Sequence, residues 1–171
     1  VSMQAKRPDN GTSLTKVFEL SDNALLTSTV VANPSEKTIA TSVGEHLYFS
    51  LEKEVMSGLT INGEAIDDIF GAGSQASLME GQPLYWADFD AHASSGVLID
   101  FPAGYTVRFS AEASESDARR HDAPLGMLVW HRPGSNSICF EPTLGFAGGK
   151  GDKLTLRPMT EAVLRTLIEL Q

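Results

Sequence analysis

The stretch Ser137–Pro142 (SICFEP) places a carboxylate behind an apolar run and directly in front of a proline. Ile, Cys and Phe in succession are typical of a buried strand. Glu141 then falls at the predicted end of this strand, where the sheet opens to solvent, and Pro142 is expected to stop the ladder because it has no backbone N–H. A carboxylate next to an apolar run is costly unless something binds or uses it. The stretch therefore indicates either a placed acid or base or an ordinary strand-end glutamate that reaches water.

A second stretch, Gly44–Leu51 (GEHLYFSL), begins an alternating strand with a histidine. Side chains in a strand repeat every two residues, so His46 is predicted to share a face with Tyr48, while Phe49 is expected inside. Imidazole titrates near neutral pH, and His46 together with Glu141 would supply one acid and one base. A histidine hydrogen-bonded to backbone at a strand start is the alternative, because periodicity does not show that the two residues meet.

Turn residues separate short β-rich runs along the rest of the chain, which predicts an all-β protein with little helix. The turn 21–23 predicts a hairpin, and residues 1–13 are expected to be a loose lead-in. Asp67 and Asp68 are assigned to a loop, and residues 111–124 to a solvated loop. Strands are predicted at 17–20, 25–32, 38–43, 46–51, 59–61, 82–86, 96–101, 105–110, 127–130, 137–141 and 153–156.

Composition indicates an ordinary folded protein and argues against several classes of partner. The 171 residues suffice for one domain with a core, expected to span residues 1–171. With 13 basic and 22 acidic residues the net charge is −9, which disfavours nucleic acid or an anionic membrane as a partner. No apolar run is long enough to span a bilayer and no signal peptide is recognised, so a cytoplasmic location is expected.

The cysteine and histidine positions give no signal for a disulfide or a metal. The single cysteine, Cys139, lies in the apolar run and is interpreted as a small core residue. His92, His121 and His131 lack the paired spacing of a metal site, so no metal is expected.

Three stretches, taken in order, resemble the aldose 1-epimerases, or galactose mutarotase-like proteins, including the hexose-6-phosphate mutarotases. Residues 46–51 match that family's His-x-Tyr-Phe-x-Leu motif, and residues 140–142 match its strand ending in Glu-Pro. Residues 129–134 are similar to its Trp-x-Pro-Gly turn, with one additional residue. The resemblance runs from about residue 14 to the C-terminus and matches only the second half of complete members. It implies an antiparallel β-sandwich of the galactose mutarotase-like type, truncated to its second half.

The resemblance also implies a reaction, the interconversion of the α and β anomers of an aldohexose or its 6-phosphate. Glu141 would remove the proton from the C1 hydroxyl while His46 protonates the ring oxygen, and no metal or organic cofactor is implied.

For residues 160–170, spacing alone suits an amphipathic helix, whereas the resemblance makes them the closing strand. We favour the strand, because a terminal helix would leave a sheet edge uncovered.

Contacts to the sugar are assigned to a second group of residues. Trp130 would offer an apolar face to sugar C–H groups, and Asp67 or Asp88 would accept hydrogen bonds from hydroxyls. Core packing for Trp130 and an exposed loop for each aspartate are the alternatives. Tyr48 and Arg132 complete the predicted sugar-binding set. Arg119 and Arg120 are interpreted as solvated surface residues, with contact to a phosphate as the alternative.

Two further functions stay open at this point. The chain could be a carbohydrate-binding module, which would bind a sugar in its cleft without catalysing a reaction. It could also be a structural half-domain, which would need a partner chain. The expected partner is a small-molecule sugar or sugar phosphate, and a homodimer or a partner domain would complete the sandwich.

Overall fold

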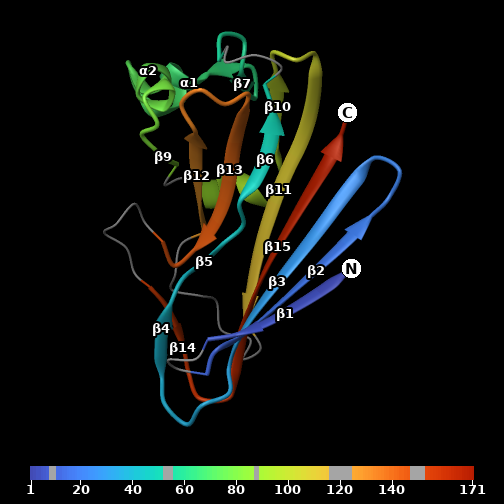
Figure 1. The fold of residues 1–171 in the computed structure, drawn as a ribbon, viewed down its shortest axis with the longest axis vertical. Coiled ribbons are helices and arrows are strands. Elements are labelled where there is room, and N and C mark those ends of the chain that lie inside the picture. The colour runs from blue at the N-terminus through green and yellow to red at the C-terminus, as the bar shows by residue number, and fades with distance from the viewer. Residues whose placement is uncertain (8–10, 52–55, 87–88, 116–124, 147–152) are drawn as a thin grey trace.

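The computed structural model describes residues 1–7, 11–51, 56–86, 89–115, 125–146 and 153–171. In these residues, antiparallel strands form a large sheet, a smaller sheet packed on part of it, and one separate strand pair (Figure 1). The large sheet has the order β1 (Ser2–Lys6), β2 (Ser13–Leu20), β3 (Ala24–Asn33), β15 (Thr160–Leu170), β11 (Tyr105–Glu115), β10 (Val97–Phe101), β7 (Thr60–Ile61) and β8 (Glu64–Ala65).

The smaller sheet carries both stretches on which the sequence analysis rests. Its order is β5 (Val43–Gly44), β13 (Ser137–Leu144), β12 (Leu125–His131) and β9 (Leu84–Trp86), and β6 (Leu47–Ser50) also pairs with β13. The separate pair is β14 (Leu154–Leu156) with β4 (Ile39–Thr41). The short helices α1 (Ile66–Phe70), α2 (Ser74–Met79) and α3 (Asp90–Ala93) complete the described elements.

Aromatic side chains fill the space between the two sheets. Phe49 of β6 stacks on Phe101 of β10 with ring centres 5.2 Å apart, and it meets Phe140 of β13 edge to face. The ring centre of Phe109 in β11 lies 6.5 Å from that of Phe140, and Phe109 is fully buried. Offset and edge-to-face pairs of this kind add to the free energy gained from burial alone. The prediction that Phe49 points into the core is confirmed.

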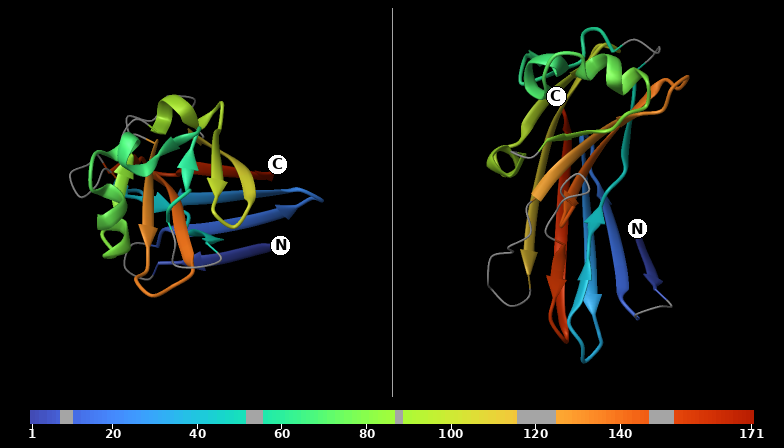
Figure 2. Two further views of the ribbon diagram at one scale, coloured as in Figure 1. Left: turned by 90° about the horizontal axis from the view of Figure 1, so that it is seen from above. Right: turned by 90° about the vertical axis from the view of Figure 1, so that its left-hand side faces the viewer.

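Burial decreases across the large sheet from β15 toward β1. Alternate residues of β15 and β3 are buried, β2 is half-buried or exposed, and all of β1 is exposed. Figures 1 and 2 show why, since β1, β2 and β3 diverge from the smaller sheet. Burial in the large sheet is therefore greatest along β3, β15, β11 and β10.

Several predicted elements are confirmed. The hairpin at residues 21–23 joins β2 to β3, with Ser21 N donating to Ala24 O at 2.9 Å. The strand predicted at 59–61 contains β7, and Asn62 and Gly63, both with positive φ, form the turn to β8, as two-residue hairpin turns of the primed type require. Residues 160–170 form β15, which pairs with β3 and β11, so the strand prediction is confirmed.

Three predictions about loops are wrong. Residues 2–6 are not a loose lead-in but form β1 in register with β2. Asp67 and Asp68 lie in the first turn of α1, where acidic side chains complement the helix dipole and the buried Ile66 anchors the turn. Residues 111–115 extend β11, because small inward side chains such as Ala111 alternate with charged outward ones such as Glu112. Residues 116–124, with Arg119 and Arg120, lie outside the described residues.

None of the helices in the described ranges is long and apolar enough to cross a membrane.

Candidate functional site

Glu141 lies inside β13 and not at its end, so the expectation that Pro142 stops the strand is wrong. The strand continues to Leu144 and pairs with β12 on one side and with β5 and β6 on the other. Pro142 instead removes one bond of the ladder. Glu45 N donates to Pro142 O at 3.1 Å, and the return bond is missing because proline has no N–H. The interruption separates β5 from β6 without changing the direction of the chain.

The strand register brings His46 and Glu141 together. Gly44 pairs with Thr143 in β5, Leu47 pairs with Phe140 in β6, and continuing either register places His46 opposite Glu141. Facing residues on neighbouring strands have side chains within contact distance on the same face. Their meeting, which periodicity left undecided, follows from this register.

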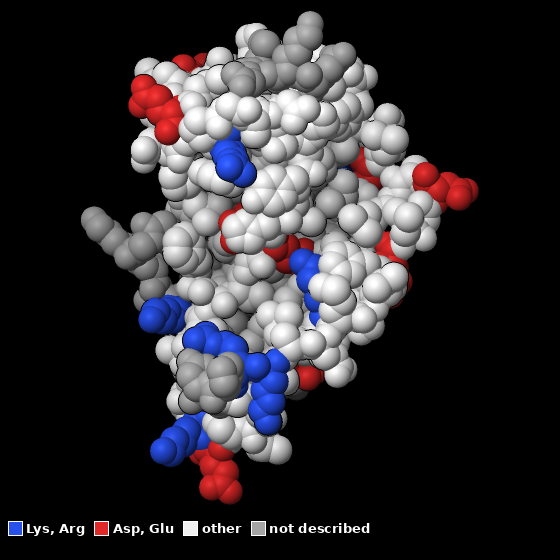
Figure 3. Space-filling model, viewed as in Figure 1, with Lys and Arg blue, Asp and Glu red and all other residues white. Residues whose placement is uncertain are grey.

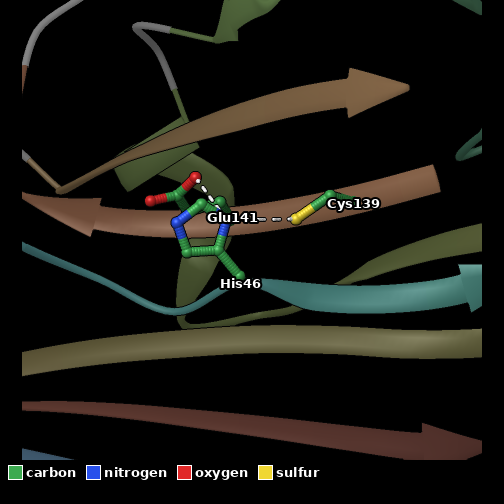
Figure 4. Close-up of side chains that lie close together, drawn as sticks. All are labelled: His46, Cys139 and Glu141. Atoms are coloured by element: carbon green, nitrogen blue, oxygen red, sulfur yellow. Dashed lines mark hydrogen bonds and ion pairs between the residues drawn. The ribbon is translucent and has the colours of Figure 1, made fainter. Parts of the chain in front are cut away.

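The two side chains form a close pair at the surface of the smaller sheet (Figure 4). His46 Nδ1 lies 3.4 Å from Glu141 Oε2, and the histidine side chain is 64% exposed, whereas the glutamate side chain is 16% exposed. Cys139 Sγ lies 3.8 Å from the same nitrogen. An exposed imidazole over a recessed carboxylate leaves the pair open to a ligand from one side.

Burial sets the proton affinities of the two acidic groups in this cluster. The pKa of Glu141 is raised because burial disfavours its charged form, and the neighbouring His46 opposes that rise. Burial, with a smaller contribution from the Glu141 charge, raises the pKa of Cys139 to about 12. Glu141 is thus a stronger base than an exposed carboxylate, and Cys139 is a neutral thiol at pH 7.

Gly44 makes room for the Glu141 carboxylate. A Cβ at this position would overlap Glu141 Oε1 and press on the Thr143 side chain. A small pocket of about 110 Å³ opens beside them, with Glu141 in its wall. Its lining residues are Ser42, Val43, Gly44, Leu128, Glu141, Thr143 and Phe146. In Figure 3, acidic side-chain atoms lie recessed near the middle of the face.

Aromatic residues share this open face. The rings of Tyr48 and His46 stack with centres 6.4 Å apart. Trp130 pairs with Cys139, and Tyr85 pairs with Leu128, the partner of Glu141, so strand alternation places both on the Glu141 side of the sheet. Trp130 is half-buried and its Nε1 donates to Gly81 O at 3.1 Å. A Cβ at Gly126 would overlap the Tyr85 ring, so glycine at this position leaves room for the ring.

Of the remaining predicted sugar contacts, Asp67 and Arg132 are not brought to this pair. Asp67 lies in the helical segment at one end of the molecule (Figure 1), where its Oδ1 accepts a 2.7 Å hydrogen bond from Gln75 N. This contact ties α1 to the start of α2. Arg132 is exposed in the turn that follows β12. Asp88 lies outside the described residues.

Glu45 is an important residue that the sequence analysis did not single out. Its side chain is fully buried on the core side of the sheet, accepts hydrogen bonds from the hydroxyls of Thr27 and Thr29, and lies 3.4 Å from Lys16 Nζ. These partners belong to β2 and β3, so Glu45 ties the histidine strand to the large sheet. The alternation that puts His46 outward puts Glu45 inward, where a carboxylate needs partners.

Solved structures show what this fold is similar to. The chain aligns over 99% of its length with the Slr1438 protein of Synechocystis sp. PCC 6803, at a TM-score of 0.69 and 15% identity. A galactose mutarotase-like protein of Lactobacillus casei aligns over 99% of this chain at a TM-score of 0.65 and 18% identity. One from Clostridium acetobutylicum does so at a TM-score of 0.63 and 13% identity.

This chain spans 61%, 69% and 61% of those three proteins, respectively. No protein-family model matches the sequence, and no curated protein matches it. The likeness is therefore one of fold, and it confirms the expected galactose mutarotase-like β-sandwich.

Proposed function

We propose that this chain, which has the galactose mutarotase-like fold, interconverts the α and β anomers of an aldohexose or hexose 6-phosphate by acid/base ring opening. The observation that carries the proposal is the pairing of His46 with Glu141, with Nδ1 and Oε2 3.4 Å apart on an open face. An acid and a base held side by side suit a substrate whose two reacting oxygens share one carbon atom.

The proposed reaction needs His46 protonated and Glu141 ionised. Glu141 takes the proton from the C1 hydroxyl, the C1–O bond to the ring oxygen breaks as the aldehyde forms, and His46 protonates the ring oxygen. Rotation about the C1–C2 bond and the reverse proton transfers close the ring to the other anomer. The raised pKa of Glu141 makes it a better proton acceptor, and its burial disfavours competing hydration.

The aromatic residues on the same face suit a sugar ring. Tyr48 stacks beside His46, and Trp130 and Tyr85 lie on the Glu141 side of the sheet. Flat apolar ring faces pack against sugar C–H groups while hydroxyls remain hydrated. We assign sugar contact to these three residues and no longer to Asp67, whose carboxylate holds the helical segment.

The test is anomer exchange measured by NMR saturation transfer on glucose, galactose and glucose 6-phosphate. The wild-type chain is compared with Glu141→Gln and His46→Gln, and each substitution is expected to lower the catalysed rate by about 10²- to 10⁴-fold. Glu112→Gln is the matched control, because Glu112 is an exposed strand carboxylate paired with Arg165 on the large sheet. A folded wild-type chain that accelerates none of the three exchanges would contradict the proposal.

A carbohydrate-binding module without turnover is the second candidate, because the aromatic face with Tyr48 and Trp130 suits sugar binding whether or not the pair reacts. Sugar titration followed by NMR chemical shifts separates the two. Shifts near Trp130 without exchange would favour the binding module.

A further inference from the structure

Cys139 is the member of the open-face cluster that the proposed sugar chemistry does not use. It was expected to be a core residue, and it is buried, yet its sulfur lies on the same side of β13 as the Glu141 carboxylate. His46 Nδ1 is within 3.8 Å of the sulfur and 3.4 Å of Glu141 Oε2. A thiol, an imidazole nitrogen and a carboxylate therefore meet at one point, although the sequence separates Cys139 from His46 by 93 residues.

Two of the three donor-atom separations fit a tetrahedral metal ion, and the third has an upper bound. One ligand atom from each residue lies within 4.8 Å of the other two. With Zn–N and Zn–O bonds near 2.1 Å and a Zn–S bond near 2.3 Å, tetrahedral angles separate N from O by about 3.4 Å and N from S by about 3.6 Å. The observed N-to-O distance of 3.4 Å and N-to-S distance of 3.8 Å lie within about 0.2 Å of these values, and the sulfur and the carboxylate oxygen lie within 4.8 Å of each other.

We propose that His46 Nδ1, Cys139 Sγ and the Glu141 carboxylate form a binding site for Zn²⁺, with the fourth position open to solvent. Thiolate with imidazole favours zinc over magnesium or calcium, which prefer oxygen ligands alone. The exposed His46 side chain leaves the site accessible from the open face. Cys139 and Glu141 lie in β13, and His46 lies between β5 and β6, which both pair with β13, so the ladder holds the backbone on either side of each ligand.

Binding releases a proton from sulfur. The Cys139 thiol loses its proton to solvent as the S–Zn bond forms, and the imidazole coordinates through its unprotonated nitrogen. Because the thiol gives up this proton when it binds the metal, the zinc affinity is expected to increase with pH. The cation also neutralises the thiolate and carboxylate that it brings together.

The site uses the same atoms as the proposed acid/base pair, so zinc is expected to inhibit anomer exchange. This consequence rests on the proposed function, whereas zinc binding itself does not. Cys139→Ser removes one zinc ligand and leaves His46 and Glu141 in place. In that variant, exchange is expected to proceed and zinc is expected to inhibit it weakly.

The first experiment uses Co²⁺ as a spectroscopic probe of the intact chain, with a phosphine as reductant. One equivalent of cobalt is expected to give a sulfur-to-metal charge-transfer band in the near ultraviolet, which one equivalent of Zn²⁺ removes by competition. A folded wild-type chain without this band overturns the proposal, and this result needs no variant.

The second experiment compares zinc affinity, by competition with a chromophoric chelator, in wild type, Cys139→Ser, Cys139→Ala and His46→Gln. Each ligand substitution is expected to weaken binding by more than the roughly 10- to 100-fold that loss of a supporting contact costs. His92→Gln is the control, because His92 is exposed and lies in α3, against Trp86. Equal affinity in folded Cys139→Ser and wild type would overturn the site, even if anomer exchange were confirmed.

Discussion

Two carboxylates in the histidine-bearing sheet have opposite surroundings. Glu45 is fully buried and has two hydroxyl donors and a lysine ammonium as partners. Glu141 lies under an exposed histidine and beside a thiol, and burial raises its pKa. A buried charge that has all its partners stabilises one arrangement of the chain. A recessed charge that has few partners remains available to bind a proton, a sugar or a metal.

The two carboxylates are linked through neighbouring residues. Glu45 precedes His46 in the chain, and its partners in β2 and β3 fix the strand that carries the histidine. Glu45 therefore supports the pair from the core side without touching the open face. Substitutions on either side separate these two roles.

The largest expected effect is on stability, from Glu45→Ala. Removing this carboxylate leaves Lys16 with a half-buried charge and two buried hydroxyls without their acceptor, so the free energy of unfolding is expected to fall by about 3–5 kcal/mol. Urea denaturation followed by circular dichroism measures the change. A loss no larger than that of the exposed control Glu112→Gln would show that Glu45 does not tie the sheets together.

Gly44→Ala tests the space reserved for Glu141. The added methyl group overlaps Glu141 Oε1, so overpacking is expected to cost about 1–3 kcal/mol and to move the carboxylate away from His46. Gly126→Ala is the matched control, because its methyl group overlaps Tyr85 instead. We expect the two variants to lose similar amounts of stability. Only Gly44→Ala is expected to change the titration of Glu141, which carbon-detected NMR follows.

The pH dependence of the proposed anomer exchange is expected to follow the ionisation of the Glu141 carboxylate. The base must be ionised, and its pKa is raised, so the rate is expected to increase with pH through a midpoint above the ordinary value of 4.5. Below that midpoint the rate falls about tenfold per pH unit, as the ionised fraction does. A rate that stays level down to pH 4 would assign the base to another group.

The smallest expected effect is a gain in stability from Glu141→Gln. The pKa of Glu141 is raised in the folded state, so its protonated carboxyl adds to the free energy of unfolding at low pH. This contribution is lost as the pH rises through the pKa of the folded state. A neutral amide avoids that loss. The variant is expected to exceed wild type in free energy of unfolding at pH 8 and to lose this advantage near pH 4, which paired urea titrations measure.

Local patterns explain what was predictable in this fold. Alternation placed Phe49 inside and His46 on the face of Tyr48, and the turn residues at 21–23 predicted the hairpin between β2 and β3. Strand β1 was missed because all its residues are exposed, so no burial pattern marks it. Helix α1 was missed because five residues are too few for a helical pattern of apolar residues to be detected.

The sequence by itself determined which side of each strand a residue takes and which residue types are available for acid/base chemistry. Only the tertiary structure decided that His46 meets Glu141, that Cys139 joins them, and that Glu45 reaches Thr27 and Thr29. The physical reason is the range of the interactions. Side-chain alternation is set within a few residues, whereas the register between β13 and the histidine segment is set by the packing of both sheets.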